Sequence, residues 1–395
     1  MIWRQSRLDA LAPEVRQTID PSLFGEVDVE HYSIPAIDAT GGPEVVPASE
    51  IRSAKQRLAG GEVMVSRLNP RKARVLRVPP LKSHVALASG EFVVMSPRNV
   101  DARFLTYLLL AETTRQYLDS RVQSVTRSHQ RIRPEDLLKM SVAVPEPEEQ
   151  RAIADYLDAE TARIDALLAK QRQMIKLFDE RAEALTDSLV QSWPVVPLRR
   201  LAERVVVGIA EAATYAYVDD GVPLLRSTNI RANHLDTNDL LFIDAGLAGR
   251  NRSKTIRPKD ILTVRTGNAG VSAVVPVELG GAQCFTQLIT TLRAGQSPEL
   301  ICAALNASRA RRYFASAGWG SAQANISVPL LAQAPVPNIP ADEQPHLLHA
   351  LMTSQQARLS VGNATRQLVR LLSERREAVI SAVVTGELDI PGVAA

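Results

Sequence analysis

Short polar segments rich in Arg, Lys, Asn and Gln contain the residues of this chain that best suit a defined chemistry. Arg can pair bidentately with guanine, and Asn or Gln with adenine, in the major groove of DNA. Lys and Arg also neutralise phosphates, which supplies affinity without sequence information. In the first half of the chain the candidate DNA-binding residues are Arg67, Asn69, Arg71, Lys72, Arg74, Arg127, His129 and Gln130. In the second half they are Arg226, Asn229, Arg252, Lys254, Asn268, Trp319, Ser321 and Gln323.

A single residue of this kind is more often part of an ordinary solvated loop. The clusters, however, stand at equivalent places in the two halves of the chain. Basic residues are concentrated in segments 67–77, 121–133, 250–259 and 309–312, whereas carboxylates dominate 146–165. The formal net charge of +3, from 46 Lys and Arg against 43 Asp and Glu, conceals this uneven distribution. Local basic patches favour a polyanionic partner.

Several kinds of catalytic site have no counterpart in the sequence. There is no GxxxxGKS or GxxxxGKT loop for ATP, and no GxGxxG follows a β-like run. The Asp/Glu-x-Lys pattern common in metal-dependent nucleases is absent, as is the Asn/Asp-Pro-Pro-aromatic tetrapeptide of amino-methyltransferases. Two Cys residues, Cys284 and Cys302, form no cluster with metal-ligand spacing. We therefore expect a non-catalytic protein with no metal site and no cofactor of its own.

Length and composition favour a packed protein of more than one domain. The 395 residues include 45% hydrophobic and 23% charged residues. Charged residues interrupt the N-terminus before the apolar core of a signal peptide could form, and no run approaches the roughly 18–20 apolar residues that cross a bilayer. We expect a cytoplasmic protein with no membrane association.

The chain repeats itself once, at an offset of about 194 residues. Leu137-Leu138, Pro145 and Glu148-Glu149-Gln150 recur as Leu330-Leu331, Pro337 and Asp342-Glu343-Gln344. Segment 173–183 likewise aligns with 367–377, and 62–67 resembles 260–265. Such a spacing, about half the chain, indicates two homologous halves.

Each half begins with a globular part and ends with a helical part. Segments 62–66, 91–95 and 261–265 are typical of strands, and 102–119 and 298–314 have helical patterns. A hairpin turn is the favoured interpretation of Arg265–Gly270, ahead of an anion-binding loop. We predict an α+β protein with four parts. Residues 1–147 and 192–341 form two tandem α/β domains, which alternate with helical segments 148–191 and 342–395.

A heptad pattern dominates the first helical segment. Its seam consists of Leu157, Thr161, Ile164, Leu168, Gln171, Ile175, Phe178, Ala182, Leu185 and Leu189. The second segment keeps Leu351, Leu359, Val369, Leu372, Val379 and Val383, but Gly362-Asn363 predicts a weaker or kinked helix. Helices of about 40 residues would be about 60 Å long, and pairing as an antiparallel coiled coil would cover both seams. An apolar heptad is usually only a packing surface, which here would act as a rigid spacer.

Together these segments resemble the specificity subunit of type I restriction–modification systems. The resemblance covers nearly the whole chain and depends on the two-copy arrangement more than on any single motif. The similar segments are 137–153, which leads into the heptad helix, 385–390, 320–326, 32–38 and 68–70.

The resemblance implies a role in reading double-stranded DNA. Each globular part would be a target recognition domain that reads one half of a split sequence, and the paired helices would set the gap. Two methyltransferase subunits would dock, bind S-adenosylmethionine and methylate adenine N6, and restriction subunits could join. The loops differ between the halves, as in 127–132 against 320–326, so we expect an asymmetric target.

Two alternative functions stay open. One is a nuclease or methyltransferase with an unrecognised site, and the other is a coiled-coil assembly protein that binds nucleic acid without sequence preference.

Overall fold

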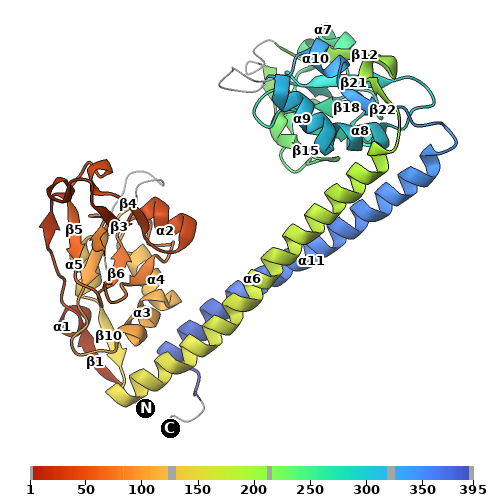
Figure 1. The fold of residues 1–395 in the computed structure, drawn as a ribbon. Coiled ribbons are helices and arrows are strands. Elements are labelled where there is room, and N and C mark those ends of the chain that lie inside the picture. Colours follow the sequence, from red (N-terminus) through yellow and green to blue (C-terminus); the bar gives the residue numbers. More distant parts are fainter. Residues whose placement is uncertain (1–2, 83, 123–129, 211–215, 318–324, 391–395) are drawn as a thin grey trace. The chain divides into compact units, whose positions relative to one another are not determined.

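Two compact units make up the chain in the computed structural model, which describes residues 3–82, 84–122, 130–210, 216–317 and 325–390. One unit comprises Met1–Gln171 with Arg366–Ala395, and the other Arg172–Thr365. Each unit contains one globular part and a stretch of both long helices, α6 (Pro147–Gln191) and α11 (Gln344–Val384) (Figure 1). The predicted mixture of sheets and helices with two long helices is confirmed.

The globular part of the first unit is built on three small sheets. A five-stranded sheet has the order β2-β5-β8-β3-β4, a three-stranded sheet the order β7-β6-β9, and β1 pairs with β10. All neighbouring strands are antiparallel except β3 and β8. The strands are β1 (Arg4–Arg7), β2 (Thr18–Ile19), β3 (Asp28–Tyr32), β4 (Glu44–Pro47), β5 (Lys55–Leu58), β6 (Val63–Ser66), β7 (Val75–Arg77), β8 (Val85–Ala88), β9 (Phe92–Met95) and β10 (Ser141–Val144).

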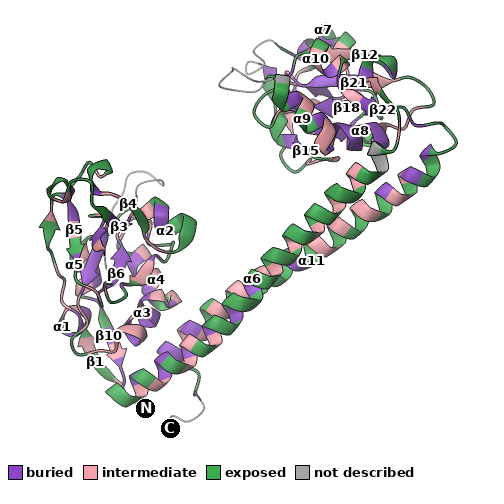
Figure 2. Ribbon diagram, in the orientation of Figure 1, coloured by how far each residue is buried: buried purple, intermediate pink, exposed green. Residues whose placement is uncertain are grey.

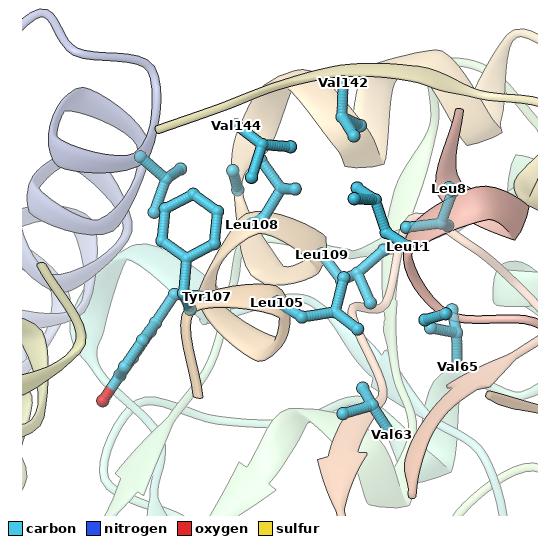
Figure 3. Packing of buried hydrophobic residues seen from close by; sticks show 14 of the residues in the cluster. Leu8, Leu11, Val63, Val65, Leu105, Tyr107, Leu108, Leu109, Val142 and Val144 are labelled. Carbon is cyan, nitrogen blue, oxygen red and sulfur yellow. The ribbon is translucent and has the colours of Figure 1, made fainter. Parts of the chain in front are cut away.

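Helices cover the three-stranded sheet and join it to the long helices. They are α1 (Leu8–Leu11), α2 (Ile34–Thr40), α3 (Ala102–Leu110), α4 (Glu112–Asp119) and α5 (Pro134–Leu138). Figure 3 shows the apolar face of α3, with Leu105, Leu108 and Leu109, between β6 and β10. The same core includes Leu157 of α6 and Val383 of α11, both at most 1% exposed. Since a fully buried aliphatic side chain contributes about 1.5–3 kcal/mol, this core fixes both helices to the globular part of the unit.

The second unit has the same plan with different sheet sizes. Two four-stranded sheets have the orders β12-β21-β18-β19 and β13-β17-β14-β20, and two further pairs are β15-β16 and β11-β22. The strands are β11 (Val195–Pro197), β12 (Ala202–Val207), β13 (Tyr217–Val218), β14 (Val222–Leu225), β15 (Ile230–Arg231), β16 (His234–Leu235), β17 (Leu241–Ile243), β18 (Ile261–Thr263), β19 (Ser272–Val274), β20 (Gln283–Cys284), β21 (Leu288–Leu292) and β22 (Pro335–Pro337). The helices are α7 (Ala245–Arg250), α8 (Pro298–Asn306), α9 (Ser308–Ala317) and α10 (Val328–Ala332).

The repeated Gln of the sequence motif performs the same structural task in both units. Gln150 donates its side-chain amide to the carbonyl of Pro145 (2.9 Å), and its Oε1 accepts from the backbone of Asp101 (2.8 Å). Gln344 donates to Ile339, again five residues earlier (3.0 Å), and to Gly295 (3.1 Å). Both side chains are buried. A buried amide that satisfies otherwise unpaired backbone groups explains why this residue type recurs where each long helix begins.

The two long helices lie side by side within each unit (Figure 1). In the first unit Glu160 pairs with Arg375 and Asp165 with Arg376; in the second, Asp179 pairs with Arg358. Helix α11 is continuous through Gly362-Asn363, so these two residues do not end the helix; the weaker or kinked helix predicted there stays a prediction. A glycine inside a helix costs only about 1 kcal/mol, which packing against α6 can override.

Candidate nucleic-acid interface

Two of the candidate DNA-binding loops directly follow buried strands, β6 in the first unit and β18 in the second, which occupy equivalent places in the two units. Every residue of β6 and of β18 is buried (Figure 2). Segment 67–74 follows β6, and segment 264–271 forms the turn between the antiparallel strands β18 and β19. The hairpin interpretation of Arg265–Gly270 is therefore confirmed.

In the first unit the two predicted polar segments meet, although about sixty residues separate them in sequence. The backbone N–H of Asn69 donates to the carbonyl of Gln130 (2.8 Å), and that of Ile132 donates to the carbonyl of Arg67 (3.1 Å). Asn69 has a φ of 50°, a left-handed conformation that Asn adopts more readily than most residues. Arg131 binds Glu91 through two hydrogen bonds, of 2.8 and 3.1 Å, beside this junction.

The second unit brings together the equivalent segments. The N–H of Ile326 donates to the carbonyl of Arg265 (2.9 Å), and the Arg265 Nε donates to the side-chain oxygen of Asn325 (3.0 Å). Thr266 and Asn325 form an isolated bridge, as Leu68 and Arg131 do in the first unit. Each globular part thus presents one composite surface made from a post-strand loop and a later polar segment.

Most of the described candidate residues keep at least part of their side chain in solvent. Arg71 is 68% exposed and pairs with Asp119, and Lys72 is 60% exposed and pairs with Asp38. Arg226 pairs with Asp239. Arg252 and Asn268 are exposed; Arg67, Asn69, Gln130 and Lys254 are half-buried. The candidates Arg127, His129, Trp319, Ser321 and Gln323 lie outside the described residues.

Two candidates lie inside the fold. The Arg74 side chain is 7% exposed and forms two hydrogen bonds to Asp38, Nε to Oδ1 at 2.7 Å and Nη2 to Oδ2 at 2.9 Å. Asn229 is 3% exposed; its amide donates to the carbonyls of Asp236 and Asp239, and its oxygen accepts from the backbone of Arg226. Because their polar groups are engaged internally, both residues hold loops in place in this structure and do not face solvent.

The residue that anchors the first loop was not a sequence candidate. Asp38, in α2, accepts hydrogen bonds from both Arg74 and Lys72. The Arg74 guanidinium, with Lys72 beside it, holds the pKa of this carboxyl well below its usual range. Asp38 precedes the loop by some thirty residues, and no spacing rule connects the two segments.

Within the described ranges, no three His, Cys, Asp or Glu side chains are grouped as a metal site would require. Both thiols are buried, and burial raises the pKa of Cys284 to about 12. No helix in the described part of the chain has the length and apolar character of a membrane span.

Comparisons with known proteins give two curated relatives, both of them type I restriction enzyme specificity subunits. No protein-family model matches the chain. It is 27% identical over 212 residues to the StySPI type I restriction enzyme specificity subunit of Salmonella potsdam, covering 51% of this chain and 44% of that protein. It is 24% identical over 147 residues to the EcoKI type I restriction enzyme specificity subunit of Escherichia coli K12, covering 34% and 32%. The matches thus span less than half the length of either curated relative.

The fold agrees with a solved structure over almost the whole chain. A chain from a structure on complex assembly and conformational transition of the type I restriction–modification system matches with a TM-score of 0.74 and 17% identity, covering 98% of both chains. The predicted resemblance to type I restriction–modification specificity subunits is confirmed by the two curated relatives.

Proposed function

We propose that this chain is the DNA sequence-specificity subunit of a type I restriction–modification complex and has no catalytic activity of its own. The observation that best supports the proposal is the composite surface of Arg67, Asn69 and Gln130 in one unit and its counterpart around Arg265 and Asn325 in the other. Two similar but non-identical polar surfaces in one chain suit the recognition of two different half-sites.

In this proposal residues 1–147 and 192–341 are target recognition domains for an asymmetric, bipartite DNA sequence. Helices α6 and α11 pair as an antiparallel coiled coil and set the distance between the half-sites. The order of the ion pairs supports this pairing, because the partners run from Glu160 to Asp179 in α6 as they run from Arg375 to Arg358 in α11. Buried seam residues such as Ile164 and Leu168 are consistent with heptad packing.

The chemistry would come from partner subunits. Two adenine-N6 methyltransferase subunits would dock and bind S-adenosylmethionine, and restriction subunits could add cleavage. The target adenine must leave the base stack before it can be methylated, so the recognition domains would bind near a distorted duplex. The solved chain of similar fold comes from a type I restriction–modification system studied for its complex assembly, which supports a multi-subunit arrangement.

Methylome sequencing with and without the gene tests this proposal. We expect one asymmetric bipartite motif to lose adenine-N6 methylation when the gene is removed and to regain it on complementation. A purified complex that methylates no bipartite site contradicts the proposal. Activity of the isolated chain with a metal ion or S-adenosylmethionine would instead indicate an enzyme. Binding that depends on salt and never on sequence would indicate an assembly protein.

Replacing Arg67 or Gln323 with Ala should relax recognition within one half-site and leave the other half-site unchanged. A good bidentate base contact contributes about 1–3 kcal/mol of discrimination, so one base position should become degenerate in the methylome. Arg163→Ala is the matched control for Arg67, since that arginine is 75% exposed on α6, outside the composite surface. An equal loss of binding to all sequences would mean that the replaced residue contacts phosphate only.

A further inference from the structure

Helix α4 of the first unit is joined at its first turn to the long helix α11. Its N-cap residue is Ala111, whose side chain cannot accept a hydrogen bond from the free N–H groups at the start of the helix. The acceptor is supplied by Ser381 of α11, whose Oγ accepts from the N–H of Glu112 (2.9 Å). One turn further along α4, the guanidinium of Arg115 donates to a carboxylate oxygen of Glu377, also in α11 (2.8 Å).

Helix α9 of the second unit repeats this arrangement against the other long helix, α6. It begins at Ser308, directly after Ala307, and the N–H of Ser308 donates to Oδ1 of Asp187 in α6 (2.9 Å). The guanidinium of Arg311 donates to a carboxylate oxygen of Glu183, also in α6 (3.1 Å). Each short helix thus receives from a long helix one acceptor for its first turn and one carboxylate for its arginine.

The four acceptors occupy matching positions of the internal repeat. Glu183 and Glu377 are 194 residues apart, as are Asp187 and Ser381, which is the offset of the repeat along the helices. Within each long helix the two acceptors are four residues apart, so they lie on one face. We call each set of four residues a clamp: Glu112, Arg115, Glu377 and Ser381 form the first clamp, and Ser308, Arg311, Glu183 and Asp187 form the second. A contact that both copies of the repeat form is difficult to explain as an incidental surface pair.

From the clamp, each short helix reaches the composite surface of its own unit. The hydroxyl of Tyr117, in α4, donates to the carbonyl of Asp136 in α5 (3.2 Å), and α5 follows the later polar segment of the first composite surface. The hydroxyl of Tyr313, in α9, donates in the same way to the carbonyl of Leu330 in α10 (3.2 Å), which follows the later segment of the second surface. Helices α4 and α9 therefore connect a long helix with the surface that is proposed to contact DNA.

We propose that the two clamps fix the angle of each recognition domain on the long helices and so keep the gap between the half-sites to a single length. The inference rests on the proposed function and names the positioning residues. Apolar cores hold each domain against the helices without direction, whereas hydrogen bonds and ion pairs restrict its angle. Glu183 and Arg311 are 58% and 51% exposed, and an ion pair this exposed adds little to stability. Orientation explains its presence in both units better than stability does.

Methylation of duplexes with altered gaps by the purified complex tests this assignment. The duplexes carry the half-sites found by methylome sequencing, with the native gap or a gap one base pair longer. For Asp187→Ala we expect the preference for the native gap to fall about tenfold, because the loss of an N-cap acceptor has an effect of this order. Both half-site sequences should stay the same in the methylome. Glu180→Ala is the matched control and should keep the wild-type preference, since Glu180 is 56% exposed and pairs with Lys176 of the same helix.

Charge reversal separates positioning from damage to the fold. Glu183→Arg places two cations together and should lower the gap preference, and the double variant Glu183→Arg with Arg311→Glu should restore it. If Asp187→Ala and Glu183→Arg keep the wild-type gap preference, or the double variant does not recover it, the positioning role is wrong, while the proposed function stands because the wild-type complex methylates its bipartite site. If the wild-type complex methylates no such site, the proposed function itself fails. A relaxed half-site with an unchanged gap would mean that α9 supports only the reading hairpin, which also overturns the clamp.

Discussion

Asp38→Ala is expected to destabilise the first unit by about 2–3 kcal/mol and to abolish selection of one half-site. The carboxylate holds Arg74, whose side chain is 7% exposed, and Lys72 in the loop that follows β6. Removing one partner of a fully buried ion pair costs roughly 3–5 kcal/mol because the other charge stays buried. We expect about 2–3 kcal/mol for Asp38→Ala, less than for a fully buried pair, because Asp38 is 30% exposed and water can solvate part of the exposed charge. Chemical denaturation of the full chain and methylome sequencing measure the two effects.

Asp119→Ala provides the comparison for this loop. Asp119 binds Arg71 at 2.7 Å, but that arginine is 68% exposed, so the variant should change stability by less than about 1 kcal/mol and retain both half-sites. If Asp38→Ala left the specificity of both half-sites intact, the loop would not need its anchor to read DNA. Equal stability losses in the two variants would show that burial of Arg74 has no energetic consequence.

The contribution of Asp38 should also depend on pH in a defined direction. Its pKa is lower in the folded chain than the value of about 3.9 expected when unfolded. The stabilisation is therefore fully present above that unfolded value and is lost as the pH falls below it toward the folded pKa. The difference in unfolding free energy between the wild type and Asp38→Asn should be constant from pH 7 to about pH 5 and shrink in more acidic buffer. A difference that grew on acidification would contradict the assigned pairing.

Local sequence patterns predicted three of the strands, because a buried strand is a short apolar run bounded by turn residues. The run 62–66 became β6 (Val63–Ser66), and 261–265 became β18 (Ile261–Thr263). The helical pattern 102–119, in contrast, forms two helices that part at Ala111, and 298–314 divides at Ala307. Alanine is the best helix former, so these breaks are set by packing and have no signal in the sequence.

The candidate site was predictable in residue type but not in side-chain direction. Arg74 and Asn229 have the same composition signal as Arg71 and Arg252, yet the first two are buried and the others face solvent. What separates them is a distant partner, such as Asp38 for Arg74, which only the tertiary fold brings near.

Deleting one heptad from each long helix should shorten the gap in the methylated motif by about three base pairs and leave both half-sites unchanged. The ion pairs Asp165–Arg376 and Asp179–Arg358 indicate that residues 168–174 of α6 correspond to 363–369 of α11. Removing seven residues keeps the heptad phase, so the remaining seam residues still face one another. Seven residues of helix span about 10 Å, close to the rise of three base pairs at about 3.4 Å each. Methylome sequencing of a strain with the doubly deleted gene measures the new gap.

A deletion in α6 alone separates the spacer role from simple damage to the helices. Removing only 168–174 leaves the Asp179–Arg358 pair out of register with Glu160–Arg375, so we expect loss of all site-specific methylation. The matched double deletion should restore methylation at the shorter gap, because it restores the register. Full methylation at the original gap by the doubly deleted protein would mean that something other than the length of α6 and α11 sets the distance between the half-sites. The helices would then be a packing element only, as an apolar heptad most often is.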